Sequence, residues 1–530
     1  MKRFLIFLYL NIQEFIFRTL AKNTAVHKTL FFSGFEPYRW ILGKWRAWFV
    51  FEQAAQKVPA YRAFLKKHKG QAKLDTTLPL REAFEQIPSM DKDSYIKKWT
   101  IPERSLGGSL PTKGVVVDES SGSSGKPTSW VRGPLERKAV RSLLQLGFQA
   151  TTQRTNKPVF ILNAFSLGAW ATGMNVSASL TDITIIKSTG PDHEKIAQTI
   201  REFGPDYSYV VLSYPPFLKT LCDNEDIDWK KYSIIAGFGG EGISENMRQH
   251  LLQYYEGVYG SYGASDLEIN MAIETDFTIA LRQEIAANQA FADELTKTSE
   301  YGVLPMVFQY NPYEYYLESN SKGELLATVT RKQNINPRIR YNIHDRGHVV
   351  RFKDIKPVLE KHGLAHFVKK QRTNLPVLFH YGRSDLSVDY NGAVVAPDTL
   401  RDVIYADAAL SEIVENHRLI SYEDEQANKQ LHIALQLRNG ATLTAAESKK
   451  LQNQIFQQLF ALNKDFLNAC RTSSKAVWPS MAFYNYRKGP FVTDGKKLKN
   501  EYVQHCDKAQ AAQLGMKLTY ILPSELIKKD

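Results

Sequence analysis

The stretch from Asp118 to Trp130, DESSGSSGKPTSW, combines many hydroxyls with glycines and little side-chain bulk. Glycine lets backbone amides approach a ligand closely, and serine adds hydrogen-bond donors that can rotate. Successive backbone N–H groups can also form a concavity that binds anions, so this loop has the chemistry that a polyphosphate requires. The alternative is a flexible linker, which Gly/Ser-rich segments often form.

The spacing differs from that of the P-loop, GxxxxGK[ST], which leads into a helix. Gly122 and Gly125 are only three residues apart, and Pro127 stands where the P-loop has its magnesium-binding hydroxyl. Valines precede the loop and Ser129-Trp130-Val131 follow it, which favours a hairpin between two strands. We therefore interpret the segment as a phosphate-binding loop of another design.

Further short motifs rich in glycine and polar residues follow in order. They are Gly237-Phe-Gly-Gly-Glu241, Tyr259-Gly-Ser-Tyr-Gly-Ala-Ser-Asp266, Arg340-Tyr-Asn-Ile-His-Asp345, Tyr381-Gly-Arg-Ser-Asp385 and Thr493-Asp-Gly-Lys-Lys-Leu-Lys499. In order and spacing, this set resembles the adenylate-forming superfamily of acyl-CoA synthetases and peptide-synthetase adenylation domains. Within that superfamily it looks most like the phenylacetate–CoA ligase branch and its capsule-biosynthesis-like relatives. The resemblance covers roughly residues 50 to 505.

The resemblance implies an enzyme that joins a carboxylate to the α-phosphorus of ATP, expels pyrophosphate and passes the acyl group to an acceptor. Both reactants are anions, so most of the catalysis must come from charge stabilisation and alignment. In this interpretation the loop near residue 120 holds the β- and γ-phosphates. The residues assigned to it are Ser120, Ser121, Gly122, Ser123, Ser124, Gly125 and Lys126.

The resemblance also assigns the nucleotide-binding residues. They are Gly239, Gly240, Glu241, Tyr262, Asp345 and Arg383. Gly239, Gly240 and Glu241 would border the adenine, and Tyr262 would stack on the adenine ring. Asp345 would accept hydrogen bonds from the ribose hydroxyls, and Arg383 would contact the ribose or a phosphate. Much of the superfamily has glycine directly before this aspartate, whereas this chain has His344.

Three further roles follow from the resemblance. Lys496 matches the lysine that reaches the reacting carboxylate and α-phosphate, although Lys497 and Lys499 stand close by. Asp385 matches the hinge residue about which the C-terminal domain rotates. Asp266 matches the carboxylate ligand of Mg²⁺, with Glu268 as the alternative, because a hard cation prefers carboxylate oxygen.

The elements that must position these residues follow an α/β pattern. Strand-like runs alternate with helical runs between residues 159 and 236, which indicates a mostly parallel sheet covered by helices. The pattern becomes more β-like from 302 to 350. A strand at 431–437, a long helix at 445–471 and a strand at 480–486 then indicate a small α+β unit. We predict a large layered N-terminal domain, residues 1–384, joined by a hinge to a smaller mobile α+β domain, residues 385–530.

Residues 1–22 have the spacing of an amphipathic helix, with apolar and polar residues on different sides. Such a helix either docks on the protein's own core or lies on a membrane surface. The apolar run is too interrupted for a span of about 20 apolar residues, and no clear cleavage site follows it. We expect a cytoplasmic protein, attached peripherally if the helix binds a membrane.

Composition limits the other classes of function. The 530 residues include 68 basic and 55 acidic ones, giving a net charge of +13 that favours anionic ligands. No zinc-finger or RNA-binding motif is present, so we expect no nucleic-acid partner. The three cysteines form no CxxC pair, which argues against a zinc site or a disulfide framework.

Together these observations predict an AMP-forming ligase that uses ATP and Mg²⁺ to activate a carboxylic acid, with coenzyme A as the preferred acceptor. One alternative keeps the acyl-adenylate but transfers the acyl group to an amine or a hydroxyl, as polysaccharide-related members would. The other is a catalytically silent binding protein on the same fold. Phe165, Trp170 and Tyr214 are candidates for the acid pocket, with ordinary core packing as the alternative.

Overall fold

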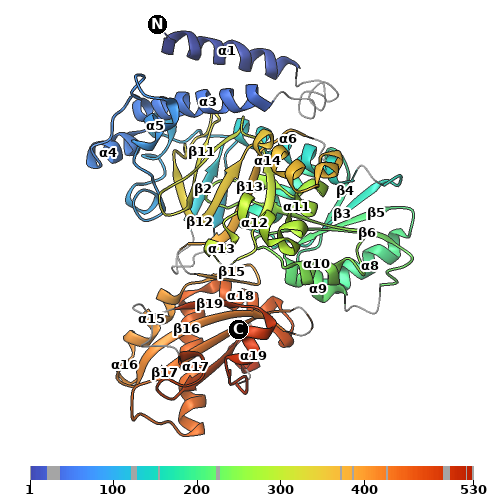
Figure 1. Ribbon diagram of the computed structural model, residues 1–530, viewed down its shortest axis with the longest axis vertical. Helices are drawn as coiled ribbons and strands as arrows, with labels where there is room; N and C mark the ends of the chain where they lie inside the picture. Colours follow the sequence, from blue (N-terminus) through green and yellow to red (C-terminus); the bar gives the residue numbers. More distant parts are fainter. Residues whose placement is uncertain are drawn as a thin grey trace.

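A computed structural model gives the fold in two parts, a large N-terminal domain and a smaller C-terminal domain below it in Figure 1. The residues that the structure describes are 2–20, 36–120, 128–152, 155–222, 227–301, 303–370, 373–384, 387–424, 426, 428–492, 502–520 and 522–527. The architecture of the two domains agrees with the expected α/β fold class. The boundary at residues 384 and 385 stays a prediction, because Asp385 lies outside the described residues.

One mixed sheet of 11 strands organises the N-terminal domain. Its spatial order is β10 (Tyr315–Ser319), β11 (Glu324–Val329), β12 (Tyr341–Val350), β13 (Val377–Arg383), β9 (Met306–Tyr310), β8 (Ala272–Ile273), β7 (Gly257–Tyr262), β6 (Ser233–Gly239), β5 (Ser208–Ser213), β3 (Val159–Asn163) and β4 (Ile185–Ser188). The strands from β7 to β4 are parallel, whereas every pair from β10 to β7 is antiparallel.

The parallel strands expected between residues 159 and 236 are confirmed, but the sheet as a whole is mixed rather than mostly parallel, which corrects the expectation for the complete domain. The physical reason lies in the connections. Parallel neighbours need a long crossover, and helices such as α8 (His193–Phe203) and α9 (Pro215–Cys222) supply it between the parallel strands. By contrast, residues 320–323 link β10 to β11, and a link this short can join only antiparallel strands.

Helices cover the sheet, and the helices at the N-terminal end of the chain enlarge the domain beyond it. They are α1 (Lys2–Leu20), α3 (Glu36–Lys57), α4 (Pro59–Lys67), α5 (Leu80–Glu85), α6 (Pro134–Thr152), α7 (Ala171–Leu180), α10 (Glu245–Leu251), α11 (Asp276–Ala287), α12 (Gln289–Leu295), α13 (Thr298–Tyr301) and α14 (Phe352–Lys361). Short 3-10 helices are η1 (Ile96–Lys98), η2 (Leu106–Gly108) and η3 (Ala365–Lys370). Helix α8 begins and ends sharply, because Asp192 caps its start and Gly204 ends it with φ +79°.

The hairpin predicted around the serine-rich loop is confirmed. Strand β1 (Val116–Ser120) pairs antiparallel with β2 (Thr128–Arg132), and Ser120 is opposite Thr128. Residues 121–127 lie outside the described residues, so only the two strands that carry the loop are known. The segment thus connects strand to strand, unlike a P-loop, which connects strand to helix.

The C-terminal domain has a four-stranded sheet in the order β18 (Ser480–Tyr484), β17 (Lys429–Leu437), β16 (Val414–Glu423), β19 (Val503–Cys506). Its helices are α15 (Pro397–Ala406), α16 (Ala408–Ile413), α17 (Ala445–Leu462), α18 (Lys464–Thr472) and α19 (Lys508–Gln513), with short 3-10 turns η4 (Lys475–Val477), η5 (Gly489–Phe491) and η6 (Ser524–Leu526). The single helix predicted for 445–471 is therefore two helices. Asn463 separates them because its backbone is not helical and its side chain caps α18 by accepting from the N–H of Phe466.

A small hairpin opens the C-terminal domain. Strands β14 (Val388–Tyr390) and β15 (Ala393–Val395) are joined by Asn391 and Gly392, with φ +49° and +83°. Two consecutive positive φ angles define the type I′ turn that suits a two-residue hairpin, and Asn-Gly is its preferred sequence. The local sequence therefore fixes a stiff turn a few residues beyond the predicted hinge.

The buried His432 of β17 makes the C-terminal domain sensitive to acid. Its ring nitrogens contact Ser480 Oγ and Tyr484 OH at 2.8 Å each, and burial lowers the pKa of His432 to about 3. Below the usual histidine pKa near 6.5, the unfolded chain takes up a proton that the folded chain does not. The free energy of unfolding should therefore fall by about 1.4 kcal/mol per pH unit as the pH drops below about 6.

Denaturant unfolding at several pH values measures this slope. His432→Gln should flatten the slope, because glutamine cannot take up the proton. The matched control is His366→Gln at an exposed histidine of η3, which should leave the slope as in the wild type. Equal slopes for the wild type and His432→Gln would contradict the prediction.

Helix α1 docks on the body of the N-terminal domain along α3 (Figure 1). Ile6 and Leu10 are buried in the main hydrophobic core, and Phe7 packs edge-on against Trp48 at 5.3 Å. One side of the predicted amphipathic helix is thus confirmed as a docking face. Within the described part of the chain, no helix has the combination of length and hydropathy needed to cross a membrane.

Candidate active site

A cavity of about 570 Å³ lies where the parallel strands end. Gly239 ends β6, Tyr262 ends β7, and Tyr214 follows β5 directly; all three line the cavity. In open α/β sheets ligands bind beyond the carboxyl ends of the strands, so this is the expected place for a site. The antiparallel strands β12 and β13 contribute Asp345 and Arg383 to the same cavity.

Tyr262, Asp345 and a third residue, His380, form the centre of the cavity wall. The hydroxyl of Tyr262 donates to Asp345 Oδ2 at 2.7 Å. His380 Nε2 is 3.2 Å from the same oxygen, and its ring centroid is 4.7 Å from that of Tyr262. An aromatic face and a carboxylate are therefore held side by side, which suits a ligand with a flat ring and adjacent hydroxyls.

Asp345 is ionised in this arrangement. Burial alone would raise the pKa of Asp345, but the hydrogen bond and charge of His380, the charge of Arg383 and the hydrogen bond from Tyr262 outweigh it. The net pKa lies below the usual value for aspartate. Asp345 also faces Arg383 across the β12–β13 pair, so the two predicted nucleotide residues are brought together by strand register.

His344 explains why glycine would suit the position before Asp345. Its φ is +63°, a left-handed conformation that costs a side-chain-bearing residue about 1 kcal/mol or more. Asn342 Oδ1 accepts from the His344 N–H at 2.8 Å, and the carbonyl of His344 accepts from the Ser384 N–H at 2.5 Å. Hydrogen bonds therefore hold the strained backbone, and the ring lines the cavity.

Glu324 ties this strained turn to the segment that precedes the predicted hinge. Its carboxylate accepts from Ser384 Oγ at 2.6 Å and from Asn342 Nδ2 at 2.9 Å. Burial would raise its pKa, but the hydrogen bonds from Ser384, Asn320, Asn342 and His344 lower the pKa of Glu324 to about 2. The carboxylate thus fixes the backbone on both sides of the β12–β13 pair.

The segment Gly239-Gly240-Glu241 passes along one side of the cavity. Gly240 has φ +87°, and a Cβ there would lie 2.8 Å from the Tyr214 ring, so only glycine fits. Glu241 is buried and accepts from Lys429 Nζ at 2.7 Å. Lys429 belongs to β17 of the C-terminal domain, so this ion pair joins the two domains beside the cavity.

Residues of the C-terminal domain complete the cavity. The turn at Gly392 lies against Tyr214, where a Cβ would be 3.1 Å from the ring. Asp389 of β14 also lines the cavity, and burial, together with the charge of Glu241, raises its pKa to about 6 against the opposing effect of Lys429. A second contact between the domains joins Ser244 Oγ to Glu423 at 2.8 Å.

The two candidate metal ligands have different surroundings. Asp266 lines the cavity, accepts from Tyr341 OH at 2.7 Å and lies 3.3 Å from Lys92 Nζ. Glu268 is 2% exposed, pairs with Arg331 and accepts from Tyr315 OH at 2.5 Å. Among the described residues, no three histidine, cysteine or acidic side chains gather in a cluster that could hold a metal ion.

The other end of the cavity is apolar. Phe165, Trp170 and Tyr214, the candidates for an acid pocket, all line it, and Phe165 meets Tyr214 edge-on at 5.3 Å. Further apolar lining residues come from α6, α7, the sheet and the β7–β8 connection: they are Leu144, Phe148, Val176, Leu180, Leu212, Ile269 and Ile273. Several of these lining residues belong to one hydrophobic cluster, so the apolar wall of the cavity is continuous with the core.

Some predicted site residues lie outside the described part of the chain. These are Ser121, Gly122, Ser123, Ser124, Gly125 and Lys126 of the serine-rich loop, Asp385 of the hinge, and Lys496. For Ser120 only the backbone is described, at the end of β1. Their roles stay predictions.

Sequence reasoning missed His380, Glu324 and Lys429. His380 directly precedes the Tyr381-Gly-Arg-Ser-Asp385 motif, and that position was its only signal. Glu324 and Lys429 belong to no recognisable sequence motif. They come close to the site through sheet pairing and domain contact, which a local pattern does not reveal. Only the folded chain brings His380 to the cavity and places Glu324 and Lys429 against residues that line it.

Comparison with solved structures bears on the fold. A 2-hydroxyisobutyryl-CoA ligase in complex with 2-HIB-AMP and CoA in the thioesterification state aligns with TM-score 0.63 at 12% identity, over 90% of this chain and 91% of that one. An amide bond synthetase from Marinactinospora thermotolerans (TM-score 0.42, 11% identity, 72% and 68% covered) is more distant. So is an o-succinylbenzoate CoA synthetase from Bacillus subtilis (0.42, 11%, 83% and 82%).

No protein-family model matches the sequence, and no curated protein matches it. At 12% identity the first structure establishes similarity of fold alone. The chain therefore shares the fold of this CoA ligase, with a large mixed-sheet N-terminal domain and a small mixed-sheet C-terminal domain.

Proposed function

We propose that this protein is an AMP-forming ligase that activates a carboxylic acid with ATP·Mg²⁺ and transfers the acyl group to an acceptor. The observation that carries the proposal is the convergence of Gly240, Tyr262, Asp266, Asp345 and Arg383 on one cavity. These residues come from separate strands and loops, and each has the chemistry that one part of ATP requires. The fold of adenylate-forming ligases supports the same function. Within that fold, the sequence motifs favour the phenylacetate–CoA ligase branch.

In this proposal the adenine lies against Tyr262, between its ring and the glycine backbone of residues 239–241. The ionised Asp345 accepts hydrogen bonds from the ribose hydroxyls, and His380 and the Tyr262 hydroxyl hold its carboxylate in place. Arg383 adds positive charge beside the ribose and phosphates. The serine-rich hairpin loop would bind the β- and γ-phosphates, and Lys496 would approach the α-phosphate and the acid carboxylate.

Asp266 would hold the Mg²⁺ together with phosphate oxygens. Its carboxylate lines the cavity, and Mg²⁺ in nucleotide sites is commonly bound by one or two carboxylates plus phosphates. The metal would neutralise charge on the phosphates. Lys92, 3.3 Å from Asp266, would add a second cation beside them. Glu268 fits this role less well, because it is buried and already paired with Arg331.

Asp266→Asn should reduce adenylation by about 10²-fold and raise the Mg²⁺ concentration needed for half-maximal rate, because a neutral amide is a weaker ligand for a hard cation. Glu268→Gln is the comparison. It should lower the temperature of unfolding, since it removes one of the two carboxylates paired with the buried Arg331, the other being Glu314, while the Mg²⁺ requirement of the folded fraction stays unchanged. A raised Mg²⁺ requirement in Glu268→Gln alone would reverse the assignment.

We propose coenzyme A as the acceptor. The solved structure with TM-score 0.63 is a CoA ligase in complex with CoA, which supports this choice, and the net charge of +13 suits an anionic thiol. The reaction on this view breaks the acyl–phosphate bond of the adenylate, forms a thioester and releases AMP. An amine or hydroxyl acceptor would give an amide or ester instead.

The first test is exchange of labelled pyrophosphate into ATP, measured with a panel of aryl and alkyl acids. Acid-dependent exchange is expected, and its absence across the panel would favour the catalytically silent alternative. The second test is the mass of the product with coenzyme A present, absent, or replaced by amines. A thioester mass that appears only with coenzyme A is expected.

The apolar wall predicts an acid with an uncharged, apolar body, and Gly147 of α6 tests it. A Cβ at Gly147 would make ordinary contacts with Ile273 at 3.5 Å and Asn270 at 3.6 Å, so alanine fits. Gly147→Leu should fill this end of the cavity and lower kcat/KM for the largest accepted acid at least about tenfold, while smaller acids lose little. Gly147→Ala is the control, with a change of a fewfold at most. Equal losses for large and small acids would contradict the prediction.

A further inference from the structure

Helix α1 has an unusual orientation on the protein surface. We define its outward face by the described residues that are exposed to solvent. They are Phe4, Leu5, Leu8, Tyr9, Asn11, Ile12, Phe15, Ile16, Thr19 and Leu20. Their spacing repeats every three to four residues, so they form one continuous stripe along the helix. All except Asn11 and Thr19 are hydrophobic, and none is charged.

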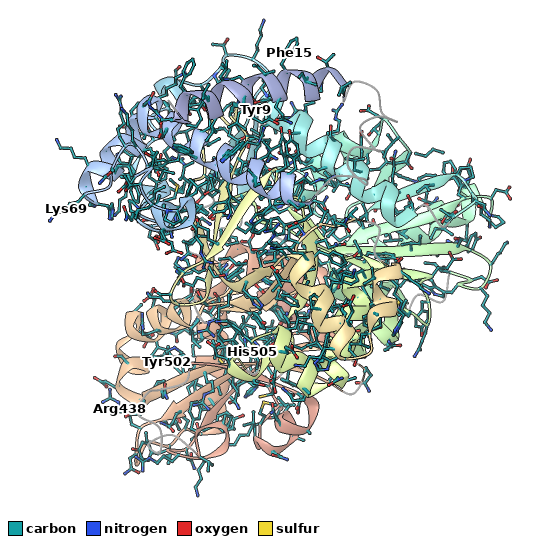
Figure 2. The ribbon with its side chains drawn as sticks, turned by 45° about the horizontal axis from the view of Figure 1, so that its top comes forward. Tyr9, Phe15, Lys69, Arg438, Tyr502 and His505 are labelled. Carbon is teal, nitrogen blue, oxygen red and sulfur yellow. The ribbon has the colours of Figure 1, made fainter. Side chains whose placement is uncertain are left out.

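The exposure of this stripe is large. Phe4 is 69% exposed and Phe15 is 73% exposed, and Figure 2 shows Phe15 at the outer edge of the molecule. Helix α3 extends the patch with Tyr38 and Ile41, and the hydroxyls of Tyr9 and Tyr38 meet at 2.5 Å. Contiguous exposed apolar surface of this kind marks an interaction site.

Gln13 and Glu14 of α1 point the other way, toward the protein, and the exposed Asn11 also contacts the protein. Asn11 accepts from Lys332 Nζ at 2.6 Å, and Gln13 Oε1 accepts from Tyr313 OH at 3.1 Å. Glu14, the single acidic residue of the helix, lies 2.8 Å from Lys332 Nζ. An ordinary surface helix turns its polar side to water, so the arrangement of α1 suits an apolar medium outside it.

Two kinds of apolar partner could cover the outward face of α1: a membrane or a second copy of the chain. The distribution of charge favours the membrane. The carboxylates of α1 and α3 are all directed inward: Glu14 to Lys332, Glu36 to Arg351, and Glu52 to Trp48. The sequence of α1 places Lys2 and Arg18 near its two ends, whereas Arg3 pairs inward with Glu52. A net charge of +13 repels another copy and attracts an anionic lipid surface.

We propose that the outward face of α1 binds an anionic membrane surface, with the helix axis in the plane of the lipid–water interface. Helices of this kind bury an apolar face in the headgroup region and place basic residues near the lipid phosphates. Tyr9 and Tyr38 would lie at the level of the headgroups, where an amphipathic ring is favoured. The inner face of α1 stays docked on α3, so the whole protein would be held at the surface. This proposal is independent of the proposed ligase activity.

Flotation of the full chain with phospholipid vesicles tests the proposal. We expect the protein to float with vesicles of mixed anionic and zwitterionic lipid and to bind purely zwitterionic vesicles at least about tenfold more weakly. The test variant combines Ile12→Gln, Phe15→Gln and Ile16→Gln, which removes apolar surface without altering the docked face. Its binding to the anionic vesicles should fall at least about tenfold.

The matched control combines Leu135→Gln, Leu252→Gln and Leu462→Gln, three exposed leucines on other elements. It should bind vesicles like the wild type, and thermal unfolding should show that both variants fold. Pyrophosphate exchange with a soluble acid separates this proposal from the ligase proposal, because neither variant should change it.

Three outcomes would overturn the proposal. The first is a wild type that stays unbound with both kinds of vesicle. The second is equal binding to zwitterionic and anionic vesicles, which would remove the role of charge. The third is a wild type that light scattering shows to be a dimer, with the α1 variant monomeric and no vesicle binding in either, which would assign the face to a second copy.

Discussion

Lys496→Ala should lower acid-dependent pyrophosphate exchange by about 10²- to 10³-fold, the loss typical of removing one donor aimed at charge that develops in a transition state. The lysine would act only while the acid attacks the α-phosphorus. Thioester formation from acyl-adenylate supplied directly should therefore keep nearly its full rate. Measuring both half-reactions on the same preparation separates this effect from general damage to the protein.

Lys497→Ala and Lys499→Ala are the matched controls, because they remove the same charge within three residues of Lys496. Each should change the exchange rate by no more than about twofold, the effect of one exposed charge. The assignment of Lys496 would fail if one of the control variants showed the large loss, or if all three lost activity equally.

Asp345→Ala should lower kcat/KM for ATP by about 10²-fold or more. Two hydrogen bonds from ribose hydroxyls to a charged acceptor contribute about 3 kcal/mol together, which corresponds to a factor of that size. The loss should appear mainly in the KM for ATP, because the ribose contacts persist through the reaction. Initial rates of exchange at varied ATP concentration measure it.

Two further variants define what Asp345 does. Tyr262→Phe keeps the ring but removes the 2.7 Å hydrogen bond to Asp345, so it should cost less than about tenfold if stacking dominates. Asp354→Ala, an exposed aspartate of α14, controls for loss of one carboxylate and should have no effect on KM. A normal KM in Asp345→Ala would contradict the proposed ribose site.

Much of the fold could be predicted from local patterns. The alternating strand and helix runs predict β3, β5 and β6 between residues 159 and 236, and the strand predicted at 431–437 falls within β17. Local signals were less informative where a single residue interrupts a periodic pattern. Asn463 divides one predicted helix into two because its side chain caps the second, a choice that helical periodicity does not reveal.

The sequence by itself determined the chemical types at the candidate site and the order in which they occur: a hydroxyl-rich hairpin, a glycine pair, an aromatic ring and two carboxylates. These are properties of short segments. Tertiary structure alone decided that Asp266 rather than Glu268 faces the cavity, because the two positions differ in what packs against them. It also decided that His380 meets Tyr262 and Asp345, since strand register sets which residues become neighbours. The direction in which α1 turns its apolar stripe was decided the same way: the amphipathic pattern gives a helix two faces, but ion pairs with Lys332 and Arg46 determine which face the protein holds.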